Sequence, residues 1–480
     1  GYAQSFLPRS TWFFFKLPKH LKNYFIIFLL FALVLSKSAK NQNYIISEIS
    51  INGNNKTKKE VILKELCFNE KDSIDYLTLE KAISESKQNL LRTSLFNYVD
   101  LNYKTDESQV FVNVNVEERW YWWVYPIFEH GSRNLSSFII DKDFSQINYG
   151  GVVELHNIKG KNNYFKIKVR GGYRQHYALT LFLQNFEKTK NHGFKINAET
   201  FIQKKIISNI LENKAVYSLS SFLNFNSHFV YSYRINLNNQ IGLGMAYKHY
   251  WVKDNNQETF ISNYTSYYLN PIIFYNFDNR NNKVYPTNGF LININCGYWY
   301  NLNNKFTSFI GNNFEFQIHK TIKKSRFAVH NISSYKFYKE DKNQNTFFQT
   351  QLEFGKDFWI RGYEYFYFMG NNTVKTQNTL SFLLSKTKIH NLPKFLPNEF
   401  KKAYTKIYLE IFGDLIYTDG YNKTFNLNNN FNKNINYTFG IGASFETYYD
   451  RLLQINLTYI PNISKIGIFV NYKTPLIKLY

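Results

Sequence analysis

The side chains that most often carry out catalysis are scattered through this sequence rather than grouped. His176, His192 and His228 stand apart from one another, and no His/Asp set has the spacing of a metal site. The sequence contains no Gly-x-Ser-x-Gly elbow for a nucleophilic serine and no glycine-rich loop for binding phosphate. We therefore predict no catalytic residues, no bound metal, no cofactor and no enzymatic activity, and interpret the histidines as ordinary structural residues.

The chain has only two cysteines, Cys67 and Cys296, which fall in regions that we interpret as separate domains. This number and spacing do not fit a disulfide framework or a metal site, so we expect two unpaired thiols.

Composition limits the classes of protein that the chain can belong to. Its mean hydropathy of −0.40 excludes a polytopic helical membrane protein, whose spans need about 20 apolar residues each. The net charge of +23 is spread over the whole chain, so we predict no nucleic-acid partner. A basic surface can instead meet anionic lipid headgroups or acidic polypeptides, although a general bias toward Lys gives the same number. The aromatic fraction of 19% suits a protein with aromatic girdles at two membrane interfaces, and codon bias can supply part of it.

One uninterrupted apolar run, Tyr24 to Leu35, stands near the start of the sequence. Lys16, Lys19 and Lys22 precede it and small residues follow it, which is the layout of an export signal. We predict that residues 1–39 form this signal region; the alternatives are a buried helix or a membrane anchor.

Residues 44–118 have the pattern of a small α/β domain in the order β-α-α-β-β. A strand is expected from Tyr44 to Ile51, and a helix capped by Thr57 is expected to follow it. A second helix is expected over about 77–91. Two strands then follow, and the second of them alternates strictly, with Val110, Val112, Val114 and Val116 at every other position.

From residue 120 to residue 480 the sequence becomes a succession of alternating segments separated by Asn, Gly and Lys. In residues 164–171, Phe165, Ile167 and Val169 alternate with Lys166, Lys168 and Arg170. One apolar face and one strongly polar face is the pattern of a transmembrane antiparallel β-barrel, although a soluble sandwich has the same period. At about 20–23 residues for each strand and its connection, this length predicts about 16 strands.

Four short motifs follow this order of elements. The small domain contains Ile49-Ser50-Ile51-Asn52-Gly53-Asn54 and, later, Leu95-Phe96-Asn97-Tyr98-Val99. Gly150-Gly151 and then Asn157-Ile158-Lys159-Gly160-Lys161 stand early in the barrel region. Asp278-Asn279-Arg280 precedes Pro286-Thr287-Asn288-Gly289, and Ile360-Arg361-Gly362-Tyr363 comes late in the chain. Asp278 and Arg280 share one face of a strand and can pair in the lumen, and Pro286 and Gly289 predict a tight turn before Phe290.

With these motifs the sequence from residue 44 to the C-terminus resembles the BamA-like outer-membrane assembly and translocation factors of the bacterial surface antigen type. That family has POTRA domains before a 16-stranded barrel. The resemblance implies that Ile360, Arg361, Gly362 and Tyr363 form the tip of a long loop that folds back into the barrel. It also implies lumen partners for Arg361 on a later strand, where Phe412-x-Asp414 matches the family pattern and Glu410 faces the same way. Ile416 departs from the pattern, because the family has Gly there.

The resemblance implies a protein that assists the folding, insertion or translocation of polypeptides at the outer membrane. The POTRA-like domain would lie in the periplasm and either receive clients by β-augmentation or only support the barrel. A weak seam between the first strand, near Trp122 to Phe128, and the last, near Ile466 to Tyr472, would template an incoming strand. The implied partners are outer-membrane lipids, unfolded or secreted polypeptides, and periplasmic or lipoprotein subunits. A dedicated two-partner-type secretion pore, which a single POTRA domain favours, and an accessory subunit of a larger assembly machine are the alternatives.

Overall fold

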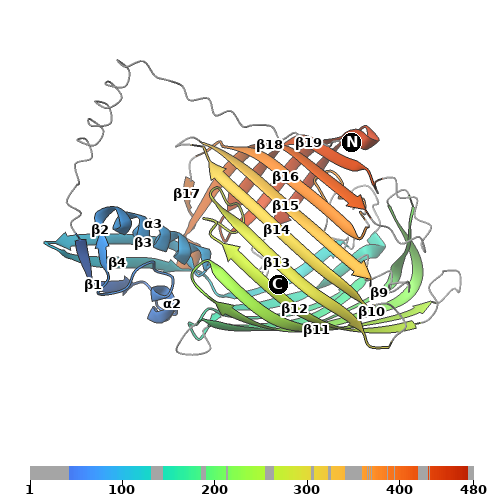
Figure 1. Cartoon of the computed structure of the whole chain (residues 1–480), viewed down its shortest axis with the longest axis horizontal. Coiled ribbons are helices and arrows are strands. Elements are labelled where there is room, and N and C mark those ends of the chain that lie inside the picture. Colours follow the sequence, from blue (N-terminus) through green and yellow to red (C-terminus); the bar gives the residue numbers. More distant parts are fainter. Residues whose placement is uncertain are drawn as a thin grey trace, which may run out of the picture.

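The computed structural model describes residues 43–130, 144–184, 191–211, 214–254, 264–303, 308–322, 326–340, 359–364, 366, 368, 370–385, 388–393, 395–419, 431 and 433–473. The expected export signal, residues 1–39, lies outside this set. The described residues form a small α/β domain at one end of a large β-barrel (Figure 1). Below, this end of the barrel is called the near end, and the opposite end is called the far end.

The small domain packs two helices against a four-stranded sheet. Its elements are β1 (Asn43–Asn52), α2 (Lys59–Leu63), β2 (Ser73–Asp75), α3 (Tyr76–Arg92), β3 (Phe96–Asp106) and β4 (Gln109–Glu118). The sheet order is β2-β1-β4-β3, with β1 and β4 parallel. The four alternating valines of β4 all enter the core, where Leu79 and Leu90 of α3 meet them. The predicted order of elements is therefore present, with the three-residue strand β2 as an addition.

The start of the first helix differs from the prediction. Lys58 rather than Thr57 stands at the N-cap of α2, and no side chain caps this helix. The hydroxyl of Thr57 instead donates a 2.6 Å hydrogen bond to the carboxylate of Glu118. A helix cap would use this oxygen as an acceptor of a backbone N–H, but in the fold the oxygen accepts from the side-chain amide of Asn157 at 2.8 Å.

The barrel strands follow one another in chain order, and each paired neighbour is antiparallel. They are β5 (Trp122–His130), β6 (Ile147–Ile158), β7 (Asn163–Gly172), β8 (Arg174–Gln184), β9 (His192–Leu211), β10 (Lys214–Arg234), β11 (Asn239–Asp254), β12 (Tyr264–Asp278), β13 (Gly289–Asn301), β14 (Phe309–Thr321), β15 (Phe327–Glu340), β16 (Asn372–Leu383), β17 (Lys388–Asn391), β18 (Lys402–Asp419), β19 (Ile435–Thr447), β20 (Arg451–Ile460) and β21 (Lys465–Lys473). Short 3-10 helices are η1 (Phe144–Gln146), η2 (Asn398–Phe400) and η3 (Pro461–Ile463). β16 pairs directly with β18, and β17 adds only a short pairing at the near end of β18. The described residues thus give sixteen main strands in a closed barrel, as predicted.

Alternation along each strand separates a polar lumen from an apolar outer surface. On β18, Leu409, Ile411 and Leu415 are exposed on the outside, whereas Glu410 and Asp414 are buried on the inside. An apolar outer surface around a polar lumen is the arrangement of a barrel that spans a membrane; a sandwich turns its apolar face inward. None of the helices in the described ranges is long and apolar enough to cross a membrane.

The ring closes where β21 meets β5, and among the described residues this closure is the weakest pairing of neighbouring main strands. Along the described residues, these two strands lie side by side over a much shorter stretch than any other neighbouring pair of main strands. Their outward side chains are correspondingly uncovered: the five most exposed large apolar side chains on the described barrel strands all belong to β5 and β21. These are Phe128, Val124, Ile466, Trp122 and Ile468. We call this closure the seam.

Candidate functional site

The tip of the connection between β15 and β16 lies inside the barrel. Residues 360–364 are all buried, and the N–H of Tyr363 donates to the carbonyl of Ile360 at 3.1 Å, which closes a turn. Gly362 has a φ of +95°, and a Cβ added there would lie 2.8 Å from a methyl carbon of Thr458 on the lumen wall. Two features therefore require glycine at this position: the left-handed backbone and the close approach to β20. Below, residues 360–364 are called the re-entrant tip.

Arg361 holds the re-entrant tip to the lumen wall through Asp414 of β18. Its Nε and Nη2 donate to the two carboxylate oxygens at 2.8 and 2.5 Å, and its backbone N–H donates at 3.2 Å. Nη2 also donates to the hydroxyl of Thr379 at 3.0 Å. The side chain of Asp414 has no exposed surface, so this two-pronged ion pair is shielded from solvent.

The other residues expected around Arg361 have different roles. The ring of Phe412 lies under the guanidinium, whose carbon is 3.9 Å from the ring centroid, a cation–π contact. Ile416, where the family pattern has Gly, is fully buried and packs in one cluster with Ile360 and Tyr363. Glu410 does not contact Arg361 by any hydrogen bond of the described residues. Its carboxylate instead accepts from Tyr285 at 2.7 Å, and from Ser444.

The Asp278–Arg280 motif forms an ion pair at the near end of the barrel. Nε and Nη2 of Arg280 donate to the two oxygens of Asp278, both at 2.9 Å, and Nη1 donates to Gln317 at 2.8 Å. Asp278 ends β12 and Gly289 begins β13, so the connection is a ten-residue segment, longer than the tight turn expected around Pro286 and Gly289. Gly289 has a φ of +100°, and a Cβ there would lie 2.6 Å from the carbonyl oxygen of Asn279.

Residues 279–288, called the inward turn below, enter the lumen from the near end. Asn282 accepts from the N–H groups of Val284 and Tyr285 at 2.7 and 3.1 Å, which fixes the bend. The ring of Tyr285 stacks on Tyr408 with centroids 4.1 Å apart, and its hydroxyl reaches Glu410. Sequence reasoning did not identify Tyr285, although an apolar Val-Tyr pair within an Asn- and Lys-rich turn is a signal of burial.

Ion pairs fix the small domain to the near end of the barrel. Arg119, at the domain junction, binds both oxygens of Asp450 in the β19–β20 turn at 2.7 and 3.1 Å. Burial alone would raise the pKa of the Asp450 carboxyl, but Arg119 holds this pKa below its ordinary value. Glu65 likewise binds Arg234 at the end of β10 through two hydrogen bonds, at 2.5 and 2.9 Å. Arg234 lowers the pKa of Glu65 despite its burial.

Two further contacts join the small domain to barrel turns. Arg92, the last residue of α3, lies 3.8 Å from the carboxylate of Asp278 and also donates to the carbonyl oxygen of that residue. On the β6–β7 hairpin of the barrel, the amide of Asn157 donates to the hydroxyl of Thr57 at 2.8 Å. The carbonyl of Gly160 accepts from the N–H of Lys58 at 3.0 Å.

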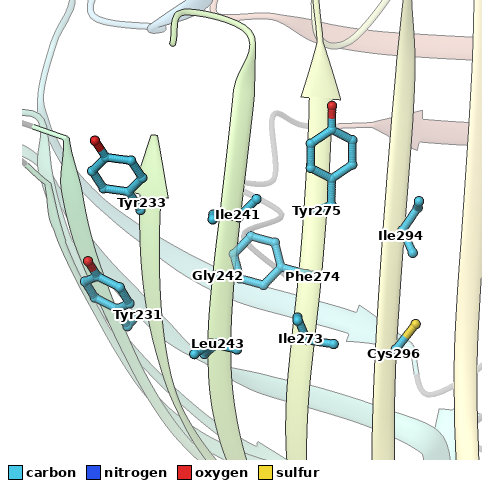
Figure 2. Close-up of a pocket in the computed structure, with 10 residues that line it drawn as sticks. All are labelled: Tyr231, Tyr233, Ile241, Gly242, Leu243, Ile273, Phe274, Tyr275, Ile294 and Cys296. Atoms are coloured by element: carbon cyan, nitrogen blue, oxygen red, sulfur yellow. The ribbon is translucent and has the colours of Figure 1, made fainter. Parts of the chain in front are cut away.

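Other candidate groups do not assemble into a reactive site. His176 pairs with Glu199, and His192 contacts the hydroxyl of Tyr231. Within the described ranges no three potential metal ligands lie together, and both cysteines are free thiols. A shallow hollow on the wall formed by β10 to β13 has no charged side chain among its lining residues, and Tyr231, Leu243, Ile273 and Cys296 contribute to it (Figure 2). This hollow suits an apolar chain rather than a reactant.

Comparison with known proteins covers both parts of the chain. Residues 44–119 match the POTRA family model, described as the surface antigen variable number repeat. No curated protein sequence matches the chain. Among solved structures, BamA from Haemophilus ducreyi lacking POTRA domains 1–3 aligns with a TM-score of 0.51 at 14% identity, over 90% of this chain and 84% of that one. CdiB from Escherichia coli aligns with a TM-score of 0.50 at 11% identity, over 89% of this chain and 75% of that one.

At 14% and 11% identity, these two structures establish the fold of the chain and nothing beyond the fold. The match in the small domain, the sixteen main strands and the overlap with both structures agree with one another. The chain is a POTRA-barrel protein whose architecture is that of BamA and CdiB.

Proposed function

We propose that this chain is an outer-membrane protein that assists the folding, insertion or translocation of polypeptides without covalent chemistry. In this proposal the barrel spans the outer membrane of a Gram-negative bacterium, and the POTRA domain at its near end lies in the periplasm. The fold shared with BamA and CdiB supports this function, as does the apolar outer surface of the barrel. The partners are outer-membrane lipids, unfolded or secreted polypeptides and, in a larger assembly, periplasmic or lipoprotein subunits.

The seam is the observation that carries the proposal. A strand edge whose backbone groups are poorly paired is a template for another strand, and proteins normally cover or shorten such edges. Here the described residues of β5 and β21 pair over a short stretch within an otherwise continuous barrel. An incoming segment can pair there while its outward side chains meet the lipid beside Val124, Phe128 and Ile466.

The POTRA domain offers a second edge on which a client can be received. β3 is an outer strand of the four-stranded sheet, and among the described residues it pairs with β4 alone. An extended segment can add to such an edge through backbone hydrogen bonds, which require no particular client sequence. A client bound on β3 stays close to the barrel, because the ion pairs of Arg119 and Glu65 fix the domain at the near end.

The re-entrant tip acts in this proposal as an internal support for the barrel wall during insertion. Arg361 joins it to β18, and Gly362 packs it against Thr438 and Thr458 on β19 and β20. These strands stand directly before β21 in the barrel order, so the support acts next to the seam.

The test is a reconstitution of client folding. The purified chain is placed in liposomes, an unfolded outer-membrane barrel is added, and its folding is followed by heat-modifiable gel mobility and protease protection. We expect wild type to accelerate folding and Arg361→Ala to lose most of that acceleration while its own barrel stays folded. Arg326→Ala is the matched control, because Arg326 is an exposed arginine in a near-end turn.

Each other outcome has a definite meaning. Full acceleration by Arg361→Ala would refute the role given to the re-entrant tip. No acceleration by wild type, together with export of one specific secreted partner, would replace assembly by a dedicated secretion pore. No activity alone, together with stoichiometric co-purification in a larger complex, would make the chain an accessory subunit.

A further inference from the structure

The lumen is occupied from both ends, and the two occupying segments meet along one strand. The re-entrant tip comes from the far end and binds Asp414, whereas the inward turn comes from the near end and binds Glu410. Glu410, Phe412 and Asp414 are successive inward positions of β18, about 7 Å apart from one to the next. Phe412 lies between the two carboxylates and carries the guanidinium of Arg361 on its face.

These groups form a continuous buried column. Tyr285, Glu410, Asp414 and Arg361 are each at most 9% exposed. One oxygen of Glu410, Oε2, has no hydrogen-bond partner among the described residues, so this carboxylate depends on the hydroxyls of Tyr285 and Ser444 at its other oxygen. A buried carboxylate without enough hydrogen-bond donors is stabilised by pairing with a cation. Loss of Tyr285 would therefore set Glu410 in competition with Asp414 for Arg361.

The inward turn is also in direct contact with the POTRA domain. Arg92 at the end of α3 binds the backbone carbonyl of Asp278 and lies 3.8 Å from its carboxylate, which in turn holds Arg280. Asn282 reaches from the same turn to Glu446 on β19 at 3.0 Å. The turn is thus anchored at its root by the POTRA domain and at its tip by the lumen wall.

We propose that the inward turn is a second plug that couples the position of the POTRA domain to the hold of Arg361 on Asp414. This inference rests on the proposed function and names the regulation of the same site. While Arg92 engages Asp278, the turn keeps Tyr285 on Glu410, and Arg361 stays on Asp414. When a client draws α3 away, the contact of Arg92 with Asp278 breaks and Tyr285 leaves Glu410. Glu410 then competes with Asp414 for Arg361, and the hold on the re-entrant tip weakens.

The test measures hydrogen–deuterium exchange of residues 359–364 in the full chain, folded in a lipid nanodisc. Tyr285→Phe keeps the ring that stacks on Tyr408 and removes only the hydroxyl. Arg92→Met keeps most of the side-chain volume and removes the contact with Asp278. We expect each to speed exchange of the re-entrant tip by roughly twofold to thirtyfold, the range of couplings carried through contiguous contacts. The double variant should be no faster than the stronger single variant, since both act through one turn.

Two variants separate the relay from general loosening. Arg119→Met removes a docking pair that makes no hydrogen bond to the inward turn, while the pairs of Arg92 and Glu65 still hold the POTRA domain. At neutral pH it should therefore leave exchange of the re-entrant tip close to that of wild type. Glu410→Gln added to Tyr285→Phe removes the competing charge and should restore slow exchange. The proposal is overturned if Tyr285→Phe has no effect, if Arg119→Met equals Arg92→Met, or if Glu410→Gln fails to restore protection. No client enters this measurement, so a failure of the proposed function would appear only in the folding assay.

Discussion

Replacing Arg361 by alanine tests the hold on the re-entrant tip directly. The substitution removes the hydrogen bonds from Nε and Nη2 to Asp414 and leaves a carboxylate with no exposed surface without its cation. Removing one partner of a buried ion pair costs about 3–5 kcal/mol. If opening of the tip breaks this pair in wild type, exchange of residues 359–364 should become faster by roughly a hundredfold or more in Arg361→Ala. Arg361→Lys keeps the charge but not the two-pronged geometry, so its rate of exchange should lie between those of wild type and Arg361→Ala.

A double-mutant cycle decides whether the pair itself is responsible. Asp414→Ala alone should be about as damaging as Arg361→Ala, because it leaves a buried guanidinium unpaired. The double variant should be less damaging than the sum of the two, by about 0.5–3 kcal/mol. Additive effects, or wild-type protection of the tip in Arg361→Ala, would refute the reasoning, because the pair would then contribute nothing that depends on both members.

Three further predictions concern the tip and the docking of the POTRA domain. Gly362→Ala should displace the tip and speed its exchange, because a Cβ would lie 2.8 Å from Thr458 and the backbone has a φ of +95°. Glu364 is buried, and the Asn471 side chain and nearby backbone groups compensate its carboxylate only in part, so Glu364→Gln should slow exchange of the tip. The lowered pKa of Asp450 means that its pair with Arg119 stabilises docking above the ordinary pKa of 3.8 and is lost as the pH falls below it. Small-angle scattering should therefore show the POTRA domain leaving the barrel at lower pH in wild type than in Asp450→Asn, which has already lost this pair at neutral pH.

The architecture was predictable because it depends on local patterns. Strict alternation in residues 110–116 and 164–171 identifies strands, and the lengths of the alternating segments give the number of strands. The contact of Arg361 with Phe412 and Asp414 could be predicted only from the resemblance to a family, because no local pattern links residues so far apart in the sequence.

The parts that could not be predicted depend on choices between competing partners. Glu410 and Asp414 both carry a carboxylate that points into the lumen, yet Glu410 binds Tyr285 and Ser444 instead of Arg361. Nothing in the sequence around Glu410 predicts either partner. Thr57 has the features of a helix cap, but its oxygen accepts from Asn157 of the barrel and its hydroxyl donates to Glu118 at the end of the domain. Such outcomes are decided by geometry across the assembled fold, which brings partners distant in sequence close together in space.

The contact of the β6–β7 hairpin with the POTRA domain bears on how the chain folds. Asn157 reaches Thr57, and a Cβ at Gly160 would lie 2.1 Å from the carbonyl oxygen of Lys56, so the two backbones touch. This hairpin, β6 with β7, is among the first barrel elements after the POTRA domain in the chain. The sheet of the POTRA domain closes through β1 and β4, which lie near one another in the chain compared with β5 and β21, the strands that close the barrel. Because a shorter loop costs less entropy to close, the POTRA domain can form before the ring is closed. The folded POTRA domain can therefore bind the hairpin and fix its position. Each later strand can then pair with the strand before it.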